Sequence, residues 1–320
     1  MRKFRIIVSI MMICVLALAG CQKSEPSVSV NTPDINPKAE AANKDTVDVA
    51  LYFCYSGEKL LAAETRTIEV PVSTTLENAV INALIAGPSA GLNELSRLFW
   101  DGVKLTSLDS IGDILFVTLS EEFVSTQPPE NELVLDSTSA PEQKLLALES
   151  IASTIIEMGI YSSVQFQVDR GTGTSERITR AEAGMDQNSQ ESLEPLKRDK
   201  NLILTPQNTV AQVLDAFNKK DWARLYDYTA YTSQDGAQKP DSDAFTLAIS
   251  GTGNSIESYT IEDSNVSYDG QTAIVMLSLT LKTREGDTQE RPNFSVILMR
   301  ESYIWKVSYI SVQEIFVNVE

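Results

Sequence analysis

Residues 74–88 read TTLENAVINALIAGP, and this stretch predicts the first helix of the chain. Thr74 and Glu77 stand three positions apart and form a capping box, which satisfies free N–H groups at the start of a helix. Gly87-Pro88 predicts the end of the helix, because proline cannot continue it. Apolar residues between these signals repeat at the spacing of one helical face: Leu76, Val80 and Leu84. A helix with a single apolar face must bury that face against another element.

Strand signals lie on both sides of this helix. Alternating apolar residues and short apolar runs predict strands over residues 47–53, 60–70, 103–108, 114–119 and 164–168. A second helix is predicted between the capping box Ser139/Glu142 and Gly159. The order β-β-α-β-β-α-β is typical of a two-layer α/β sandwich, with helices on one face of a mixed sheet. We expect this domain to span residues 47–170.

Several segments of this domain resemble the GerMN (sporulation and spore germination) family. They are residues 51–53 leading to Leu60 and Arg66, then 76–88, 115–123, 148–155 and 164–169. The resemblance implies a non-enzymatic extracytoplasmic domain, often found on lipoproteins that act in spore-envelope assembly or germination. Some members carry a tandem pair, whereas this chain shows one copy and an extended loop over 127–140. Ring assembly, known for similar folds, is therefore not inferred.

A second domain is predicted over residues 203–320. Residues 171–202 before it are polar and mix both charge signs, which predicts a linker with a short helix at 176–183. Thr205-Pro206 opens a helix and Asp221 caps the next one. The apolar period then switches to two and predicts antiparallel strands over 256–268, 273–281, 294–298 and 304–312. Helices followed by a curved antiparallel sheet make an α+β domain, so the whole chain is assigned to the α+β class.

This order resembles the cone-shaped nuclear-transport-factor-2-like fold. The resemblance is carried by Phe217, residues 220–222, Leu225-Tyr226 and residues 303–307. That superfamily includes ketosteroid isomerase and dehydratases, but many members only bind or dimerise, so the fold does not select a function. Four residues could line a pocket in the cone: Tyr226, Asp227, Tyr228 and Tyr231. The favoured interpretation is that these aromatic rings pack on the sheet while Asp227 faces solvent.

The N-terminus resembles the signal of bacterial lipoproteins. Three cations, Arg2, Lys3 and Arg5, precede an apolar run of 13 residues over 6–18, which is too short to span a bilayer. It ends in a lipobox: Leu18, Ala19, Gly20 and Cys21. The resemblance implies removal of residues 1–20 as a signal peptide, diacylglycerol on the Cys21 sulfur and a further acyl chain such as palmitate. The alternative is an ordinary cleaved signal followed by a chance cysteine.

The segment behind Cys21 predicts a flexible tether over residues 21–46, with three prolines among polar residues. Removal of the signal leaves 23 positive and 44 negative groups, a net charge of −21. Nucleic acid is therefore not an expected partner, because phosphate binding needs a basic surface. An anionic membrane would also repel the body, so the lipid, not the charge, holds it at the membrane.

Composition excludes much of catalytic chemistry. The chain has no histidine, which removes Ser-His-Asp and Cys-His triads. Residues 87–91 match the G-x-S-x-G motif, but a helix precedes the serine where the motif needs a strand. Glu121-Glu122 are expected on opposite faces of a strand, and Asp241-Ser242-Asp243 and Asp263-Ser264-Asn265 lack the rest of a calcium loop. Cys54, which cannot pair within the mature chain, is expected to be a small buried residue. We predict no catalytic residue, cofactor site or metal site.

These patterns predict a lipid-anchored binding or scaffold protein on the extracytoplasmic face of the bacterial cell membrane. Its partners are expected to be membrane lipid, through acylated Cys21, and an envelope protein whose identity the sequence does not give. The resemblance implies sporulation or germination as the setting. The alternative is a ligand-binding or isomerase/dehydratase-like enzyme that uses a pocket in the C-terminal cone.

Overall fold

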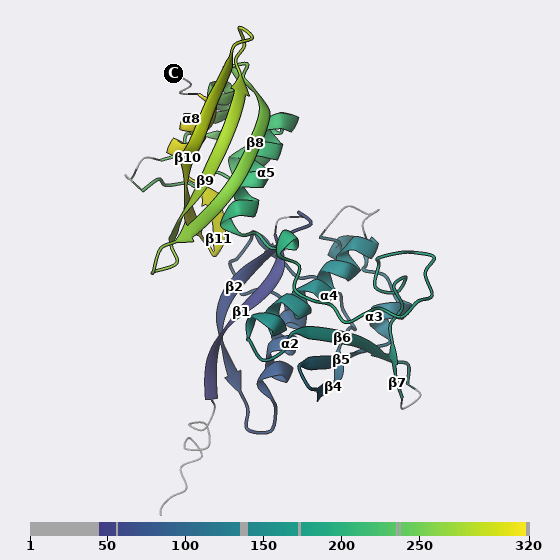
Figure 1. The fold of residues 1–320 in the computed structure, drawn as a ribbon. Helices are drawn as coiled ribbons and strands as arrows, with labels where there is room; N and C mark the ends of the chain where they lie inside the picture. Colours follow the sequence, from purple (N-terminus) through teal and green to yellow (C-terminus); the bar gives the residue numbers. More distant parts are fainter. Residues whose placement is uncertain are drawn as a thin grey trace, which may run out of the picture. The chain divides into compact units, whose positions relative to one another are not determined.

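The computed structural model describes residues 45–55, 57–134, 140–171, 174–234, 236 and 238–317. The described residues belong to one compact unit. We divide this unit into an N-terminal lobe, residues 45–202, and a C-terminal lobe, residues 203–317. Both lobes combine helices with sheets, which confirms the predicted α+β class (Figure 1).

The N-terminal lobe contains two sheets. One has the order β2-β1-β3 and consists of β1 (Asp45–Tyr55), β2 (Leu61–Val70) and β3 (Leu95–Ser96). The other has the order β4-β5-β6-β7 and consists of β4 (Leu105–Ile111), β5 (Ile114–Ser120), β6 (Ser163–Asp169) and β7 (Ser175–Arg177). Strands β5 and β6 pair in parallel, and the other paired strands described for this lobe are antiparallel. The predicted strands are present, but they belong to two sheets where the sequence suggested one.

The helices of this lobe are α2 (Leu76–Ala86), α3 (Glu122–Ser125) and α4 (Ala140–Glu157), with a 3₁₀ turn, η2, at Glu130–Glu132. Helix α2 begins one residue later than predicted, because the hydroxyl of Thr75, not Thr74, accepts the N–H of Asn78 at 3.3 Å. Gly87 ends the helix with φ of 102°, a conformation that favours glycine.

Helix α4 packs on β1 of one sheet and on β6 of the other. It is therefore buried on almost every side, beyond the apolar stripe that the sequence predicts. Its buried polar residues are Gln143, Lys144, Glu149, Ser150, Ser153 and Thr154. Two of them bind the β1 backbone: Ser150 Oγ donates to the Tyr52 carbonyl at 2.5 Å, and Tyr52 N donates to Thr154 Oγ1 at 3.1 Å. These bonds satisfy two of the buried polar groups, whereas Ser153 Oγ and Glu149 Oε2 have no hydrogen-bond partner among the described residues.

The segment predicted as a linker, residues 171–202, folds onto the N-terminal lobe. No helix forms over 176–183; the chain there contains β7, which pairs with β6, followed by turns. Leu196 and Val164 exchange two backbone hydrogen bonds of 2.9 and 2.8 Å. Ile178, Ala183 and Leu193 are buried. These apolar residues have no regular period, because turns separate them, and so sequence patterns alone do not reveal their burial.

The C-terminal lobe opens with helices and closes with a sheet. Its helices are α5 (Pro206–Lys219), α6 (Trp222–Asp227) and α7 (Ser242–Ser250), after a 3₁₀ turn, η4, at Lys200–Leu202. Its sheet is an antiparallel meander of β8 (Ser255–Val266), β9 (Thr272–Lys282), β10 (Thr288–Glu301) and β11 (Ile304–Val307). The strands curl, and α5 packs on one face of them (Figure 1). Thr205 and Asp221 cap their helices as predicted.

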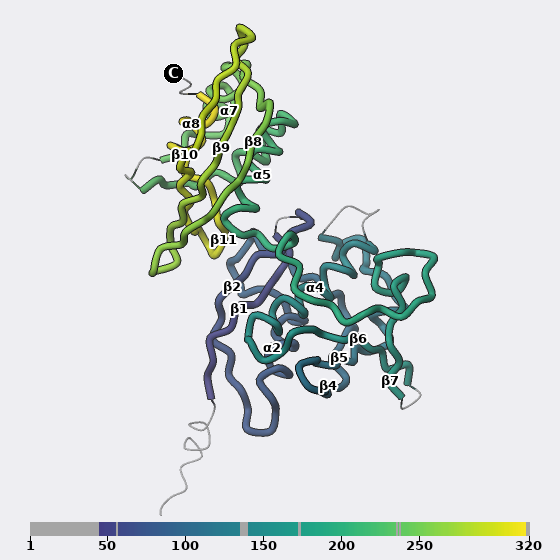
Figure 2. Tube along the Cα trace, in the orientation of Figure 1, coloured from purple at the N-terminus to yellow at the C-terminus, as the bar shows by residue number. Residues whose placement is uncertain are grey.

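The last element corrects the sequence analysis. Residues 308–312 were expected to continue the closing strand, but β11 ends at Val307 and the chain forms helix α8 (Tyr309–Phe316). Ser308 caps it by accepting the N–H of Ser311 at 3.2 Å. Val312, Ile315 and Phe316 are buried, and the trace of α8 runs beside β10 (Figure 2). A short apolar run fits a strand and a helix equally, and here tertiary packing selects the helix.

Candidate functional site

The predicted lipid-acceptor site lies outside the described residues. This applies to the signal peptide, to Leu18, Ala19 and Gly20 of the lipobox and to Cys21, so lipidation stays a prediction. Among the described residues, no helix combines the length and apolar character needed to cross a bilayer. Cys54 is buried, as expected, and its Sγ donates to the Glu58 carbonyl at 3.2 Å. Burial raises the pKa of this thiol to about 12, so it stays protonated.

The serine of the G-x-S-x-G match belongs to a structural network. Ser89 Oγ donates to the Glu64 carboxylate, and Ser89 N donates to the same group at 3.1 Å. Arg66 binds Glu64 through two nitrogens at 2.8 and 2.6 Å, and it also donates to the Gly87 carbonyl at 3.1 Å. Burial alone would raise the pKa of Glu64, but the bonds from Arg66 and Ser89 outweigh it and lower the pKa. The loop therefore anchors the end of α2 to β2.

The carboxylates considered for acid/base or calcium chemistry serve other roles. Glu121 and Glu122 are not strand residues as expected: Glu121 precedes α3, and Glu122 begins it. Asp241 caps α7 by accepting the N–H of Ala244 at 2.9 Å. Asp263 lies on β8 near an irregularity in its pairing with β9. In the described parts of the chain, no three Asp, Glu or Cys side chains gather as a metal site would require.

The aromatic residues proposed for a cone pocket point to different surroundings. Tyr226 Oη donates to the Pro240 carbonyl at 3.1 Å, and its ring meets Phe245 edge-on at 5.2 Å. Tyr228 is buried, with its ring 5.4 Å from that of Tyr55 in the N-terminal lobe. Asp227 is exposed, as the favoured interpretation predicted, and Tyr231 is exposed as well. These four side chains do not converge on one cavity.

Side chains fill the interior of the C-terminal lobe. The ring of Phe316, from α8, stacks on that of Phe217, from α5, with centroids 3.9 Å apart and planes 6° apart. Trp222 meets Phe217 edge-on at 5.8 Å, and Phe245 lies 5.9 Å from Tyr309. Aromatic pairs at these separations pack favourably. The space between α5 and α8 is thus part of the core.

Charged groups converge instead at the junction of the two lobes. Arg224 of α6 binds both carboxylate oxygens of Glu58, at 2.5 and 2.9 Å, and also binds Asp215 at 2.8 Å. Burial would lower the pKa of Arg224, but these carboxylates raise it. Lys306, which is buried, forms an ion pair with Glu94. The partners are 166 and 212 residues apart in sequence, so sequence periodicity carried no signal for them.

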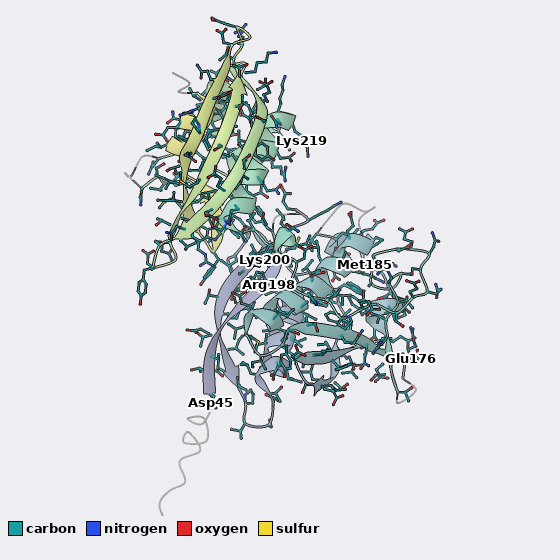
Figure 3. The ribbon with its side chains drawn as sticks, viewed as in Figure 1. Asp45, Glu176, Met185, Arg198, Lys200 and Lys219 are labelled. Carbon is teal, nitrogen blue, oxygen red and sulfur yellow. The ribbon has the colours of Figure 1, made fainter. Side chains whose placement is uncertain are left out.

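A second ionic contact holds the segment that leads into α5. Arg198 forms an ion pair with Glu157 and donates to Tyr52 Oη at 2.5 Å. Burial and the Glu157 charge raise the pKa of Tyr52 to about 12. Figure 3 shows Arg198 and Lys200 close together on this segment. The contact adds to the backbone bond from Leu204 N to the Leu61 carbonyl, 2.8 Å long, and fixes the start of the C-terminal lobe.

The N-terminal lobe carries a surface hollow of about 300 Å³ with an apolar lining. Val47, Leu76, Met158 and Ile160 contribute to it, beside the charged Asp48 and Glu157. Ile160 is 56% exposed. An exposed apolar side chain beside a hollow is suited to contact with an apolar group of another molecule.

Part of the N-terminal lobe matches a known protein family. Residues 50–172 match a family model described as Germane: Sporulation and spore germination. The predicted resemblance to this family is therefore confirmed for that segment. No curated protein matches the chain.

Matches to solved structures have low identity and low TM-scores. The tandem GerMN domains of the sporulation protein GerM from Bacillus subtilis are 20% identical, with a TM-score of 0.33 over 48% of this chain and 46% of that one. The matched part thus spans less than half of the GerM structure. A "Putative Lipoprotein from Clostridium perfringens" is 23% identical, with a TM-score of 0.26 over 48% of this chain and 88% of that one. An NTF2-like protein of unknown function from Cytophaga hutchinsonii is 10% identical, with a TM-score of 0.23 over 33% and 88%.

Proposed function

We propose that this chain is a lipid-anchored, extracytoplasmic binding or scaffold protein of the bacterial cell envelope that acts in sporulation or germination. The observation that carries the proposal is the match of residues 50–172 to a family described by those processes. The lipobox that ends in Cys21 supports the anchor, because its cationic start, apolar run and small residues fall in register.

The geometry supports binding rather than catalysis. The rings of Phe217 and Phe316 stack in the interior of the C-terminal lobe, so side chains fill this space. Two polar residues considered for chemistry have structural roles: Ser89 donates to Glu64, and Asp241 caps α7. The junction joins two unlike lobes into one body, which can present both surfaces to partners at once. The proposed partners are membrane lipid, through Cys21, and an envelope protein.

Metabolic labelling with a palmitate analogue tests the anchor. We expect label on the wild type and on Cys14→Ser, a matched control whose cysteine leaves with the signal peptide, and no label on Cys21→Ser. An unlabelled wild type, or equal labelling of Cys21→Ser, would contradict the proposal.

Crosslinking tests the binding role. A photo-crosslinking residue at Ile160, beside the apolar hollow, should capture an envelope protein from cells that express the lipidated chain. The same residue at Leu247, which is 75% exposed on α7, serves as the control for random collisions. Recovery of a small molecule without any protein partner would favour the alternative, a ligand-binding or isomerase/dehydratase-like role.

A further inference from the structure

A polar hollow of about 670 Å³ lies between the β1–β2 hairpin and two turns of the C-terminal sheet. Its lining residues on the hairpin are Asp48, Thr65 and Thr67. Its lining residues on the C-terminal sheet are Asp269, Gln271, Ser302 and Tyr303 in the turns and Arg300 near the end of β10. All of them belong to the same compact unit. The volume falls within the range of small-ligand sites, and neither the proposed anchor nor the lobe junction uses these residues.

The turn between β10 and β11 holds an aromatic residue in an unfavourable backbone conformation. Ser302 has φ of 47° and Tyr303 has φ of 72°, in the left-handed region that glycine or asparagine usually occupies. An L-residue with a Cβ atom pays about 1–2 kcal/mol for this conformation. Glu301 Oε1 accepts the N–H groups of Tyr231 at 2.7 Å and Thr232 at 3.2 Å, which anchors the turn. Strain of this kind concentrates at functional sites, and here it places a tyrosine at the hollow.

Arg300 also lines the hollow, beside the ring of Tyr303. Its guanidinium lies 5.9 Å from the centroid of the Tyr303 ring and 5.6 Å from that of Trp305, and its Nε donates to the Tyr303 carbonyl at 3.3 Å. Burial lowers the pKa of Arg300, yet within the described residues no carboxylate lies within 4.0 Å of it. A partly desolvated guanidinium with remaining N–H donors is suited to bind oxygen atoms of a ligand.

Two aspartates, one on each side of the hollow, supply hydrogen-bond acceptors. Asp48 Oδ1 accepts from Thr67 Oγ1 at 2.6 Å, and Asp269 Oδ1 accepts from Ser267 Oγ at 2.6 Å and from Gln271 N at 3.0 Å. Each bond orients a carboxylate through one of its two oxygens. With two aspartates and one arginine, the lining carries a net charge of −1, which disfavours anionic ligands.

We propose that this hollow binds a neutral glycan. Fixed carboxylates accept hydrogen bonds from sugar hydroxyls, and the Arg300 and Gln271 N–H groups donate to hydroxyl or amide oxygens. The Tyr303 ring offers an apolar face for the C–H side of one sugar ring. The inference rests on the proposed extracytoplasmic location only for the source of the ligand, which is polysaccharide outside the membrane.

Titration of a chain that begins at residue 22, and so lacks the signal and the acyl acceptor, with neutral N-acetylglucosamine oligosaccharides tests the proposal, with calorimetry and tryptophan fluorescence as readouts. The fluorescence of Trp305, whose ring lies against the Arg300 guanidinium, should change when the oligosaccharide binds. Tyr303→Gly removes the ring and relieves the positive φ, so the variant should fold at least as well as the parent and bind about tenfold more weakly. Tyr259→Ala removes a similarly exposed ring outside the hollow and should keep the parent affinity.

Three results would overturn the proposal: no binding by the parent chain, parent affinity in Tyr303→Gly, or equal losses in Tyr303→Gly and Tyr259→Ala. These results are separable from a failure of the proposed function. A chain that binds the oligosaccharides but takes no palmitate label would refute the anchor and leave the glycan site intact. A labelled chain that binds no oligosaccharide would do the reverse.

Discussion

The cores of the two lobes are built from different kinds of contact. In the N-terminal lobe, α4 contacts both sheets and buries charged and hydroxyl groups, including Glu149 and Lys144. In the C-terminal lobe, α5 and α8 meet through stacked aromatic rings, and the inward residues of β9 are apolar. Burying a polar group without a hydrogen bond costs free energy. Apolar side chains need only shapes that fit together to be buried favourably. The stability of the first lobe should therefore depend on pH, and that of the second on packing.

The largest effect is expected in the aromatic core. Phe316→Ala removes the ring that stacks on Phe217 and leaves a cavity, so the free energy of unfolding should fall by about 3–5 kcal/mol. Urea denaturation followed by tryptophan fluorescence measures the loss. The control Leu247→Ala changes an exposed residue of α7 and should cost less than about 0.5 kcal/mol. A similar small loss for Phe316→Ala would mean that α8 does not close this lobe.

The buried carboxyl of α4 should make the first lobe sensitive to pH. Glu149 is 7% exposed, and burial, with a smaller contribution from Asp199, raises its pKa from 4.5 to about 7. The folded state therefore binds the proton more tightly than the unfolded state. This contribution is complete below pH 4.5, falls as the pH rises to about 7 and is absent above it.

Glu149→Gln tests this account, since it keeps the shape and removes the charge. At pH 8 the variant should be more stable than the parent by roughly 2–3 kcal/mol, and the difference should vanish near pH 4. Denaturation curves over this range give the comparison. Glu130→Gln, at an exposed position, should follow the parent at every pH. A parallel loss of stability in the parent and Glu149→Gln would place the sensitive group elsewhere.

A smaller effect is expected where the lobes meet. Arg224→Met leaves Glu58 and Asp215 without their shared partner, so the free energy of unfolding should fall by about 2 kcal/mol. Separate fluorescence and circular dichroism transitions would then show that the lobes unfold independently. Lys219→Met removes only an exposed partner of Asp215 and should cost less than about 1 kcal/mol. Equal losses in the two variants would show that the Glu58 contact contributes nothing.

Local signals predicted most elements of both lobes. The strands over 47–53 and 114–119, the helix after Thr205 and the helix after Asp221 each carry a clear period or cap, and the structure contains them. The wrong predictions concern short segments whose residues suit more than one kind of secondary structure. Residues 308–312 form a helix because Val312, Ile315 and Phe316 fill the space beside α5. The segment over 176–183 forms a strand and turns because β6 offers an open edge.

For the candidate sites too, the sequence carried a clear signal at some positions and none at others. The serine of residues 87–91 could be rejected from its setting alone, and the structure adds the reason for its presence, the bond to Glu64. The polar hollow around Tyr303 carried no sequence signal. Its residues come from four separate segments between 48 and 303, and nothing in their local pattern brings them together. The positive φ of Tyr303 arises only in the folded turn. It could not be predicted from the residue type, because tyrosine rarely adopts this conformation.

By itself the sequence determined the α+β class, the order of most elements and the absence of histidine chemistry, while the lipoprotein signal stays a prediction. These follow from periods, caps and composition, which act over a few neighbouring residues. Only the tertiary structure decided that α4 is buried on both sides, that α8 closes the second lobe, and that Arg224 and Lys306 join the lobes. Such features arise from contacts between residues far apart in the chain, and their free energy exists only once the chain has folded.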